Sequence, residues 1–433
     1  MSIESTERAN IMRLVQSGQL ENIELGLSLA ESLQINIEEF KNDIEFIHSW
    51  IIAKQATWLN KGAHHLTLPE KIARIHSMKE LYLSQLKLTK LPNQIKCFTG
   101  ITSLNVDANQ LTNLPAVIGC LTRLEYLSIS DNQVTSLPSE ISNLIHLKYL
   151  DAKSNQLTSI PSQIAGCVNL IELELYDNQL DSLPKEVYSL PNLDTLDLGK
   201  NRFNAIPLEI TTISQLRVLH FHYNHLVTIP EELHNLTNLE ILSLDQNQLR
   251  CISSQIGKLS KLEQLHLEKN QLQSLPPEIR NLSNLISLDL SYNQLREVPK
   301  ELFQCTKLYH LYLNDNQLDC IPPDIKNLEN LYELNLKGNP LTSLPPEIAN
   351  LTRLTDLDLN KTHLEYLPLE LFSLASLEKL NLSDNKLTSL PPEISKLTRL
   401  TLLYLNNNPL PDSEIAKVRS LLPDCEIVFE CKL

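Results

Sequence analysis

Residues 285–307 read LISLDLSYNQLREVPKELFQCTK, and the chain repeats this 23-residue pattern for most of its length. The asparagine at the ninth position recurs without a slip in register. It stands at Asn109, Asn132, Asn155, Asn178, Asn201, Asn224, Asn247, Asn270, Asn293, Asn316, Asn339, Asn385 and Asn408. The one interior gap in the series, at the same phase, is Thr362. A period this strict predicts a stack of identical supersecondary units.

The residues of one copy predict its backbone. Each copy follows L-x-x-L-x-L-x-x-N-x-L-x-x-L-P, and fifteen copies run from Met78 to about Leu422. The L-x-L alternation has a period of two, so it predicts a short strand with one buried face. We expect neighbouring copies to pair these strands into one parallel sheet. A buried asparagine can satisfy the backbone groups left unpaired where the chain turns. Thr362 lacks the amide, which predicts a local weak point.

Proline closes the strand half of the copy. It follows the last apolar residue in thirteen of the fifteen copies, from Pro92 to Pro391, and Ser253 replaces it once. Proline starts an extended return segment, in which we expect a short helix or 3₁₀ turn. Because no copy can bury its apolar face alone, stability should be roughly a sum of units and interfaces.

The repeat resembles the leucine-rich repeat. The resemblance implies an α/β solenoid, a horseshoe with a parallel concave sheet of about 15 repeats. We expect three parts: a helical N-terminal cap over residues 1–65, the solenoid over 66–410 and a C-terminal cap over 411–433. Residues 66–72 look like the second half of a preceding copy.

The two caps have patterns of their own. Before residue 60, apolar spacing predicts two short helices and a longer amphipathic one from Phe40 to Trp58. At the other end we expect a helix over 412–422, with Asp412 or Ser413 as N-cap. Pro423 would end this helix, and residues 426–431 read as a last strand.

Composition narrows the classes of partner. The net charge of −15 and pI of about 5.3 argue against nucleic acid and against an anionic membrane. Acidity of this kind keeps a long solenoid soluble; the alternative is a role in binding a basic partner. With nine glycines and no G-x-G-x-x-G or Walker motif, we expect no cofactor. The chain shows no secretory signal and no C-x-x-C pair, which predicts reduced thiols and a cytoplasmic location.

Tyrosine concentrates at positions that the core leaves free. Ten of the twelve tyrosines occupy free positions on the strand or its edges, and no phenylalanine does, because Phe221 falls on a core phase. Strand preference is one explanation. A binding face is the other, and we favour it because tyrosine is enriched at binding hot spots. The predicted partner-binding residues are Tyr126, Tyr149, Tyr176, His220, His222, Tyr223, His266, Tyr292, Tyr309, His310, Tyr312 and Tyr332.

Histidines mark the middle of this face. His220 and His222 alternate onto one side, and His266 shares the phase of His220 two copies later. With Asp245 and Glu268 at the phase of His222, an H-x-H pair could bind zinc. Because the strands space these side chains widely, we favour a polar, pH-sensitive contact patch. We predict no catalytic residue and no metal.

The functional expectation is a non-enzymatic, monomeric scaffold that recognises a protein partner. The L-P-x-x-I repeat resembles those of Ras-associated, Scribble-like and Roco scaffolds, which implies signal transduction and sometimes a small GTPase partner. The segment NIELGL, from Asn22, resembles bacterial leucine-rich repeat proteins. That likeness suggests a bacterial source, and as an alternative function an effector or adaptor acting in a host cell. Related repeats also precede ubiquitin-ligase and GTPase domains, but only about 20 residues follow the last copy.

Overall fold

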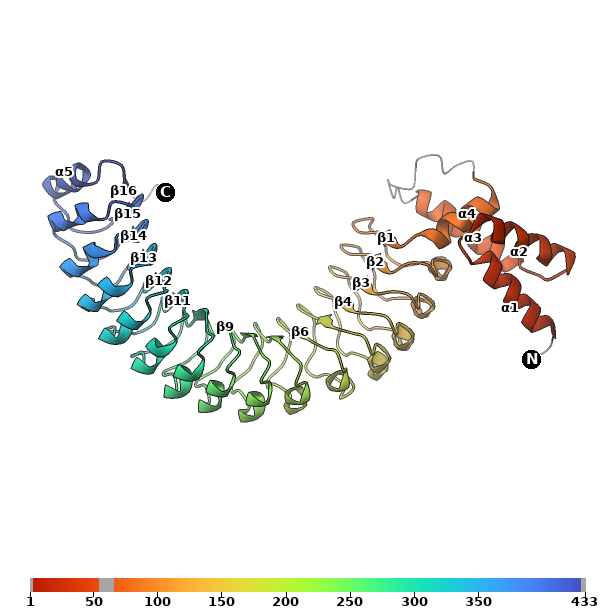
Figure 1. Cartoon of the computed structure of the whole chain (residues 1–433), viewed down its shortest axis with the longest axis horizontal. Helices are drawn as coiled ribbons and strands as arrows, with labels where there is room; N and C mark the ends of the chain where they lie inside the picture. Colours follow the sequence, from red (N-terminus) through yellow and green to blue (C-terminus); the bar gives the residue numbers. More distant parts are fainter. Residues whose placement is uncertain (1–2, 54–65, 430–433) are drawn as a thin grey trace. The chain divides into compact units, whose positions relative to one another are not determined.

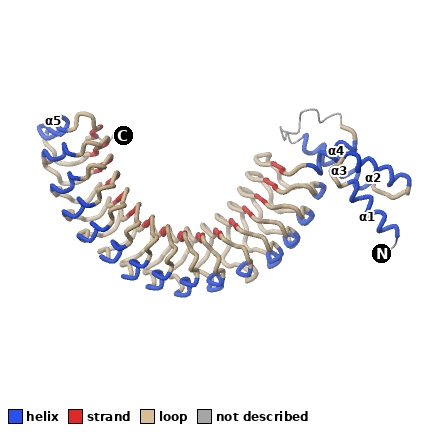
Figure 2. Tube along the Cα trace, viewed as in Figure 1, coloured by secondary structure: helices blue, strands red, loops and turns tan. Residues whose placement is uncertain are grey.

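The computed structural model describes residues 3–53 and 66–429. Sixteen parallel strands form one open sheet in sequence order, as expected. The chain divides into two compact units, Met1–Asn201 (the N-terminal unit) and Arg202–Leu433 (the C-terminal unit). Within each unit, the strands line the inner edge of the stack and the short helices line its outer edge (Figures 1 and 2).

The strands are three residues long and recur with the repeat. They are β1 (Glu80–Tyr82), β2 (Ser103–Asn105), β3 (Tyr126–Ser128), β4 (Tyr149–Asp151), β5 (Glu172–Glu174), β6 (Thr195–Asp197), β7 (Val218–His220), β8 (Ile241–Ser243), β9 (Gln264–His266), β10 (Ser287–Asp289), β11 (His310–Tyr312), β12 (Glu333–Asn335), β13 (Asp356–Asp358), β14 (Lys379–Asn381), β15 (Leu402–Tyr404) and β16 (Glu426–Val428).

The return segments are 3₁₀ helices, which confirms the expectation. They are η2 (Asn93–Cys97), η3 (Ala116–Cys120), η4 (Ser139–Asn143), η5 (Ser162–Gly166), η6 (Val187–Ser189), η7 (Leu208–Thr212), η8 (Glu231–Asn235), η9 (Ser254–Lys258), η10 (Pro277–Asn281), η11 (Lys300–Gln304), η12 (Pro323–Asn327), η13 (Pro346–Asn350), η14 (Leu369–Ser373) and η15 (Pro392–Lys396). An extended proline precedes most of them. Where Ser253 replaces it, the serine hydroxyl accepts a hydrogen bond from Gln255 N.

The core follows the repeat. Leu288 pairs in register with Leu311, and both central leucines are fully buried. The residues on either side of each leucine face the opposite way, because side chains alternate along a strand. These flanking positions form a free row on every copy and hold five of the ten tyrosines, among them Tyr126, Tyr149 and Tyr312. The other five lie just before or just after their strands.

The asparagine ladder has the predicted role. Asn132 Oδ1 accepts from Leu111 N in the preceding copy (2.9 Å), and its Nδ2 donates to Val106 O in that copy and Ile129 O in its own (both 3.1 Å). The side chain is buried. Each ladder asparagine therefore pairs backbone groups that the turn would leave unsatisfied inside the stack.

The residue before each ladder asparagine has a left-handed backbone, which the sequence analysis did not anticipate. This residue has φ between 50 and 56° at twelve copies, and it includes Tyr223 (φ 53°) and Tyr292 (φ 54°). The left-handed region costs an L-residue roughly 1–2 kcal/mol. At Gly338 (φ 70°) a Cβ would lie 2.5 Å from Asp315 Oδ1, so a side chain there would require the carboxylate of Asp315 to move.

Thr362 leaves the ladder with fewer hydrogen bonds. Its Oγ1 lies 2.8 Å from Leu359 O and 3.0 Å from Asn385 Oδ1, and a hydroxyl can donate to one of them at a time. In other copies the backbone N–H two residues after the ladder position donates to the next ladder asparagine. Leu341 N instead donates to Asn339 O, within its own copy (2.8 Å).

The N-terminal helices agree with the prediction as far as Ala53. They are α1 (Ile3–Val15), α2 (Leu20–Ser32) and α3 (Glu38–Ala53). Trp58 lies outside the described residues. Residues 66–72, predicted to be the second half of a preceding copy, lead into an α-helix where later copies have a short 3₁₀ helix. This segment begins α4 (Leu68–Ser77), whose first turn is closed by a capping box between Thr67 and Glu70. A full helical turn at this point lets α4 pack against α2 and α3.

The C-terminal cap has the predicted order of elements. The helix is α5 (Asp412–Leu421), and β16 pairs with β15. The predicted N-cap was wrong: Pro411 occupies that position with no side-chain cap, and Asp412 lies in the first turn. Glu414 of the same turn instead accepts from Leu390 N in the fourteenth copy (3.3 Å).

A buried histidine joins α4 to the first copy of the solenoid. The ring of His76 stacks on Phe40 of α3 (centroids 6.2 Å apart), and its Nδ1 lies 3.0 Å from Thr99 Oγ1. His76 is 6% exposed. Burial lowers the pKa of His76 to about 4, so the imidazole is neutral in the folded chain at neutral pH.

The ladder gap generates the first prediction. Replacing Thr362 with Asn should restore an acceptor for Leu341 N–H and add amide donors. We expect the free energy of unfolding to rise by about 1 kcal/mol, the typical net value of one buried hydrogen bond. Urea unfolding followed by circular dichroism measures this, with Asn339→Thr as the reverse change that should be destabilising. An unchanged or lowered midpoint for Thr362→Asn would contradict the assignment of a weak point.

His76 generates the second prediction. Its pKa of about 4 lies below the unfolded value of about 6.5, so the unfolded chain binds the proton first. Stability should therefore fall as the pH drops from 6.5 to 4, by about 2 kcal/mol between pH 7 and 5. Tryptophan fluorescence reports on this region, because both tryptophans lie at 50 and 58. His76→Gln should flatten the dependence, whereas His146→Gln, at an exposed site, should leave it unchanged.

Candidate functional site

Four aromatic side chains come together on the free face of the C-terminal unit. His310 and Tyr312 flank the buried Leu311 of β11, and Tyr309 and Tyr332 immediately precede β11 and β12. The rings of Tyr309 and Tyr332 stack with centroids 4.8 Å apart and planes 5° from parallel. His310 lies edge-on to Tyr309 at 4.8 Å. We call Tyr309, His310, Tyr312 and Tyr332 the aromatic surface.

Glu333 holds the aromatic surface in place. Tyr312 Oη donates to Glu333 Oε2 (2.6 Å), and His310 Nδ1 lies 3.1 Å from the same oxygen. Burial, together with the hydrogen bond to Glu333, raises the pKa of Tyr312, so the phenol keeps its proton and remains a donor. Glu333 is not among the partner-binding residues predicted from the sequence. The register signal was available, because Glu333 lies 23 residues after His310 and pairs with it.

The aromatic surface is open to solvent. Tyr309 and Tyr332 are each 38% exposed, and Ile286 on the preceding copy is 40% exposed. Backbone hydrogen bonds hold the three in a row, from Tyr332 N to Tyr309 O (2.9 Å) and from Tyr309 N to Ile286 O (2.8 Å). The result is a contiguous apolar and aromatic strip on a rigid sheet.

The histidines farther toward the N-terminus form a smaller group. His220 Nδ1 lies 2.8 Å from Ser243 Oγ, and the ring of His222 lies edge-on to it at 5.8 Å. Burial lowers the pKa of His220 to about 4, so this residue does not titrate in the physiological range that the predicted pH-sensitive patch requires. His266 Nε2 lies 3.4 Å from Gln264 Oε1. Over residues 3–53 and 66–429, no three His, Cys, Asp or Glu side chains are grouped closely enough to hold a metal ion.

Tyr223 and Tyr292 do not join the aromatic surface. Tyr292 follows β10 whereas Tyr309 precedes β11, so the two tyrosines lie at opposite ends of these neighbouring parallel strands. Lys269 Nζ lies 5.6 Å from the centre of the Tyr292 ring. Tyr223 and Tyr292 are 44% and 47% exposed, so both combine a left-handed backbone with little burial.

The N-terminal unit carries a second, looser group. Tyr126 and Tyr149 are register partners on β3 and β4, with ring centroids 6.4 Å apart. Tyr176 lies two residues after β5, against Lys200 Nζ at 5.8 Å. Of the predicted trio, Tyr126 and Tyr149 therefore form a ring pair, and Tyr176 lies against a lysine.

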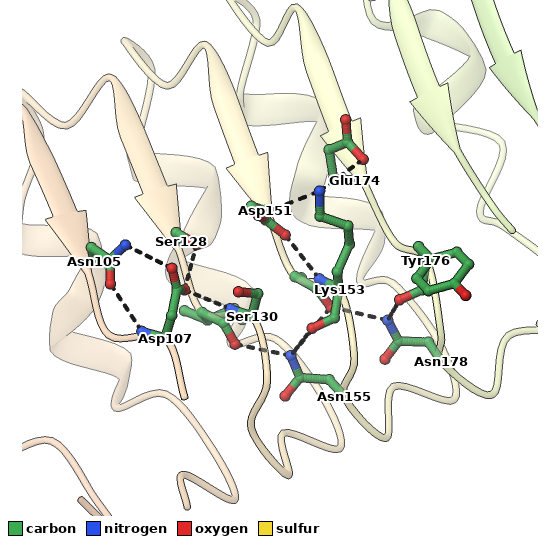
Figure 3. A network of polar contacts seen from close by, with 12 residues as sticks. Asn105, Asp107, Ser128, Ser130, Asp151, Lys153, Asn155, Glu174, Tyr176 and Asn178 are labelled. Atoms are coloured by element: carbon green, nitrogen blue, oxygen red, sulfur yellow. Dashed lines mark hydrogen bonds and ion pairs between the residues drawn. The ribbon is translucent and has the colours of Figure 1, made fainter. Parts of the chain in front are cut away.

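Figure 3 shows charged side chains of neighbouring strands in the same part of the sheet as Tyr176. Lys153 Nζ lies between Asp151 (3.7 Å) and Glu174 (3.5 Å) on neighbouring strands. Burial raises the pKa of both carboxyl groups. Two copies before Asp151, Asp107 accepts from Ser130 N (2.8 Å) and from Ser128 Oγ, both in the copy between. This face is acidic and only partly neutralised by the chain's own cation.

Within the described residues, no helix combines the length and apolarity needed to cross a bilayer. No curated protein matches the chain.

Models of protein families match much of the chain. They are "Leucine-rich repeat region" at residues 168–268 and 245–356, "Leucine rich repeat" at 352–410, and "Leucine Rich repeats (2 copies)" at 122–165.

Solved structures show the same likeness. A leucine-rich repeat protein of Leptospira interrogans is 37% identical, with a TM-score of 0.79, over 84% of this chain and 98% of that one. A plant peptide hormone receptor, RGFR1 in complex with RGF2, is 29% identical with a TM-score of 0.63, over 83% and 68% of the two chains. An internalin of Listeria monocytogenes is 22% identical with a TM-score of 0.66, over 79% and 94%, and shows the fold alone. The repeat, the sheet and these matches together place the chain in the leucine-rich repeat family.

Proposed function

We propose that the chain is a non-enzymatic scaffold that binds a protein partner, with the aromatic surface as its main contact. The observation that carries the proposal is the stacked, half-exposed pair Tyr309 and Tyr332 beside the Glu333-anchored Tyr312. The fold supports it, since the plant receptor that resembles this chain is a receptor for a peptide hormone.

The rigidity of the aromatic surface supports binding. A side chain that is already fixed loses little conformational entropy when a partner arrives, which strengthens association. Here His310 and Tyr312 are stacked within 7° of parallel and share one carboxylate oxygen. Tyrosine also contributes a large contact area with a polar tip. A polar and aromatic strip with fixed rings is suited to recognising a partner's surface.

The proposal gives the aromatic surface a contact role without chemistry. Tyr312 would be a poor nucleophile or base, because its raised pKa keeps the phenol protonated. His310 is turned toward Glu333 through Nδ1. Both side chains therefore serve to position one another on the sheet.

We also propose a cytoplasmic, monomeric protein. The support for the location is chemical: Cys97, Cys167 and Cys305 are buried free thiols, and burial raises the pKa of each to about 12. Thiols of this kind are unreactive and belong to the apolar core. A role as an effector or adaptor acting on a host small GTPase remains a prediction from sequence resemblance.

The third prediction concerns the aromatic surface. Replacing Tyr309, Tyr312 and Tyr332 together with Ala should weaken partner binding by more than about 30-fold, equivalent to the roughly 2 kcal/mol that defines a hot spot. Affinity purification of the tagged full chain from its native cells identifies the partner, and titration of the recovered partner gives the dissociation constants. Circular dichroism checks that the triple variant keeps its fold.

A matched control is available on the same unit. Tyr366 is 64% exposed and lies outside the strands, so Tyr366→Ala removes an exposed ring without touching the free face of the sheet. This variant should bind as the original chain does. Equal binding by the triple variant and by Tyr366→Ala would show that the aromatic surface is not the contact.

A further inference from the structure

We propose that the aromatic surface receives an arginine side chain of the protein partner, stacked on Tyr309 and Tyr332 and paired with Glu333. This inference rests on the proposed function of the aromatic surface as the contact site. It adds the chemistry of the group that binds there. Three properties of the described residues support an arginine at this place. They are the charge of the surrounding strands, the contacts of Glu333 and the lysines that lie over other tyrosine rings.

The strands around the aromatic surface are negatively charged. The residues of β10, β11, β12 and β13 include four carboxylates and no lysine or arginine. These carboxylates are Asp289, Glu333, Asp356 and Asp358. Lys379 on β14 pairs with Asp356 at 2.9 Å. Burial raises the pKa of Asp289 and of Asp358, so their charged forms lack full hydration and would be stabilised by a partner cation.

Glu333 has an oxygen available for a partner. Both internal contacts, from Tyr312 Oη and His310 Nδ1, converge on Oε2. Within the described part of the chain, no hydrogen bond reaches Oε1. The side chain of Glu333 is 30% exposed, so a guanidinium can approach this oxygen from solvent. A carboxylate already oriented by two neighbours makes a charge-assisted hydrogen bond with little reorganisation.

Other tyrosines of the sheet show what such a ring accepts. Lys200 lies over Tyr176 at 5.8 Å, and Lys269 lies over Tyr292 at 5.6 Å. Tyr309 and Tyr332 have no such cation among the residues that the structure describes; their ring contacts are with each other and with His310. The position that the chain's own lysines take over other rings is left for a group from the partner.

Arginine suits this place better than lysine. Its guanidinium is planar, so it can lie flat on a tyrosine ring and keep N–H groups in its plane directed at a carboxylate. The nearly parallel rings of Tyr309 and Tyr332 offer flat faces, and Glu333 follows Tyr332 directly in the chain. One arginine could therefore make the stacking contact and the ion pair together.

The fourth prediction uses two small probes on the full chain. Acetyl-arginine methylamide carries the guanidinium, and acetyl-citrulline methylamide is its uncharged analogue of the same shape. Chemical shifts of ¹³C-labelled tyrosine rings follow the titration, with Tyr→Phe variants giving the assignments. We expect saturable shifts at Tyr309, Tyr312 and Tyr332 with the arginine probe, and binding at least tenfold weaker with the citrulline probe.

Glu333→Gln tests the ion pair. This variant keeps the size of the side chain and an oxygen for Tyr312, and it should bind the arginine probe at least tenfold more weakly. Unaltered tyrosine shifts without probe would show that the surface is intact, and Tyr366→Ala serves as the unaffected control. Equal shifts from the two probes, no saturable shift at all, or full binding by an intact Glu333→Gln variant would overturn the inference.

The two proposals fail separately. Loss of the purified partner by the triple tyrosine variant tests the aromatic surface as a contact, whatever group the partner presents. If that loss occurs while the arginine probe shows no preference over citrulline, the contact site stands and its partner group is not an arginine.

Discussion

In every copy of the repeat, the chain turns into the interior of the stack after its strand. The backbone N–H and C=O groups of this turn need hydrogen-bond partners that no neighbouring strand supplies. The ladder asparagine meets this need. Asn293 Oδ1 accepts from Leu272 N in the preceding copy, while its Nδ2 donates to Leu267 O and Leu290 O. Leaving one such buried group unpaired costs about 1–3 kcal/mol. This requirement keeps consecutive copies in register, and the rest of each unit is built on that register.

A fixed register decides which side chains meet on the free face. Residues 23 apart become direct neighbours, so His310 faces Glu333 across β11 and β12. Tyr309 and Tyr332 come from the same phase, and the stacking of their rings follows from it. The same turn imposes a left-handed backbone on the residue before each asparagine, including Tyr223 and Tyr292. The proposed contact site is thus a product of the repeat geometry, with side chains that the core does not need.

Sequence predicted the strands, the ladder and the 3₁₀ returns well because each depends on contacts within one copy or between adjacent copies. It predicted poorly where the repeat stops. Residues 66–72 keep the spacing of a copy, yet the capping box of Thr67 and Glu70 starts an α-helix that packs on α3. At the other end, Pro411 is the N-cap, and Glu414 accepts a hydrogen bond from Leu390 N in the fourteenth copy instead of capping its own helix. At the first place a local capping box starts the helix, and at the second a contact with a neighbouring copy takes the place of a cap.

The candidate site shows the same division. The 23-residue period is enough to predict the parallel stack, the buried leucines and the free positions that hold tyrosine, because each of these keeps one position within the repeat. The grouping of the tyrosine rings depends instead on contacts between side chains of different strands. In the structure Tyr309 stacks on Tyr332, and Tyr312 donates a hydrogen bond to Glu333. Tyr292 lies at the other end of its strand, against Lys269. Phase places a residue on a face, but ring orientation, burial and hydrogen bonding depend on the side chains of neighbouring strands, which a single copy does not contain.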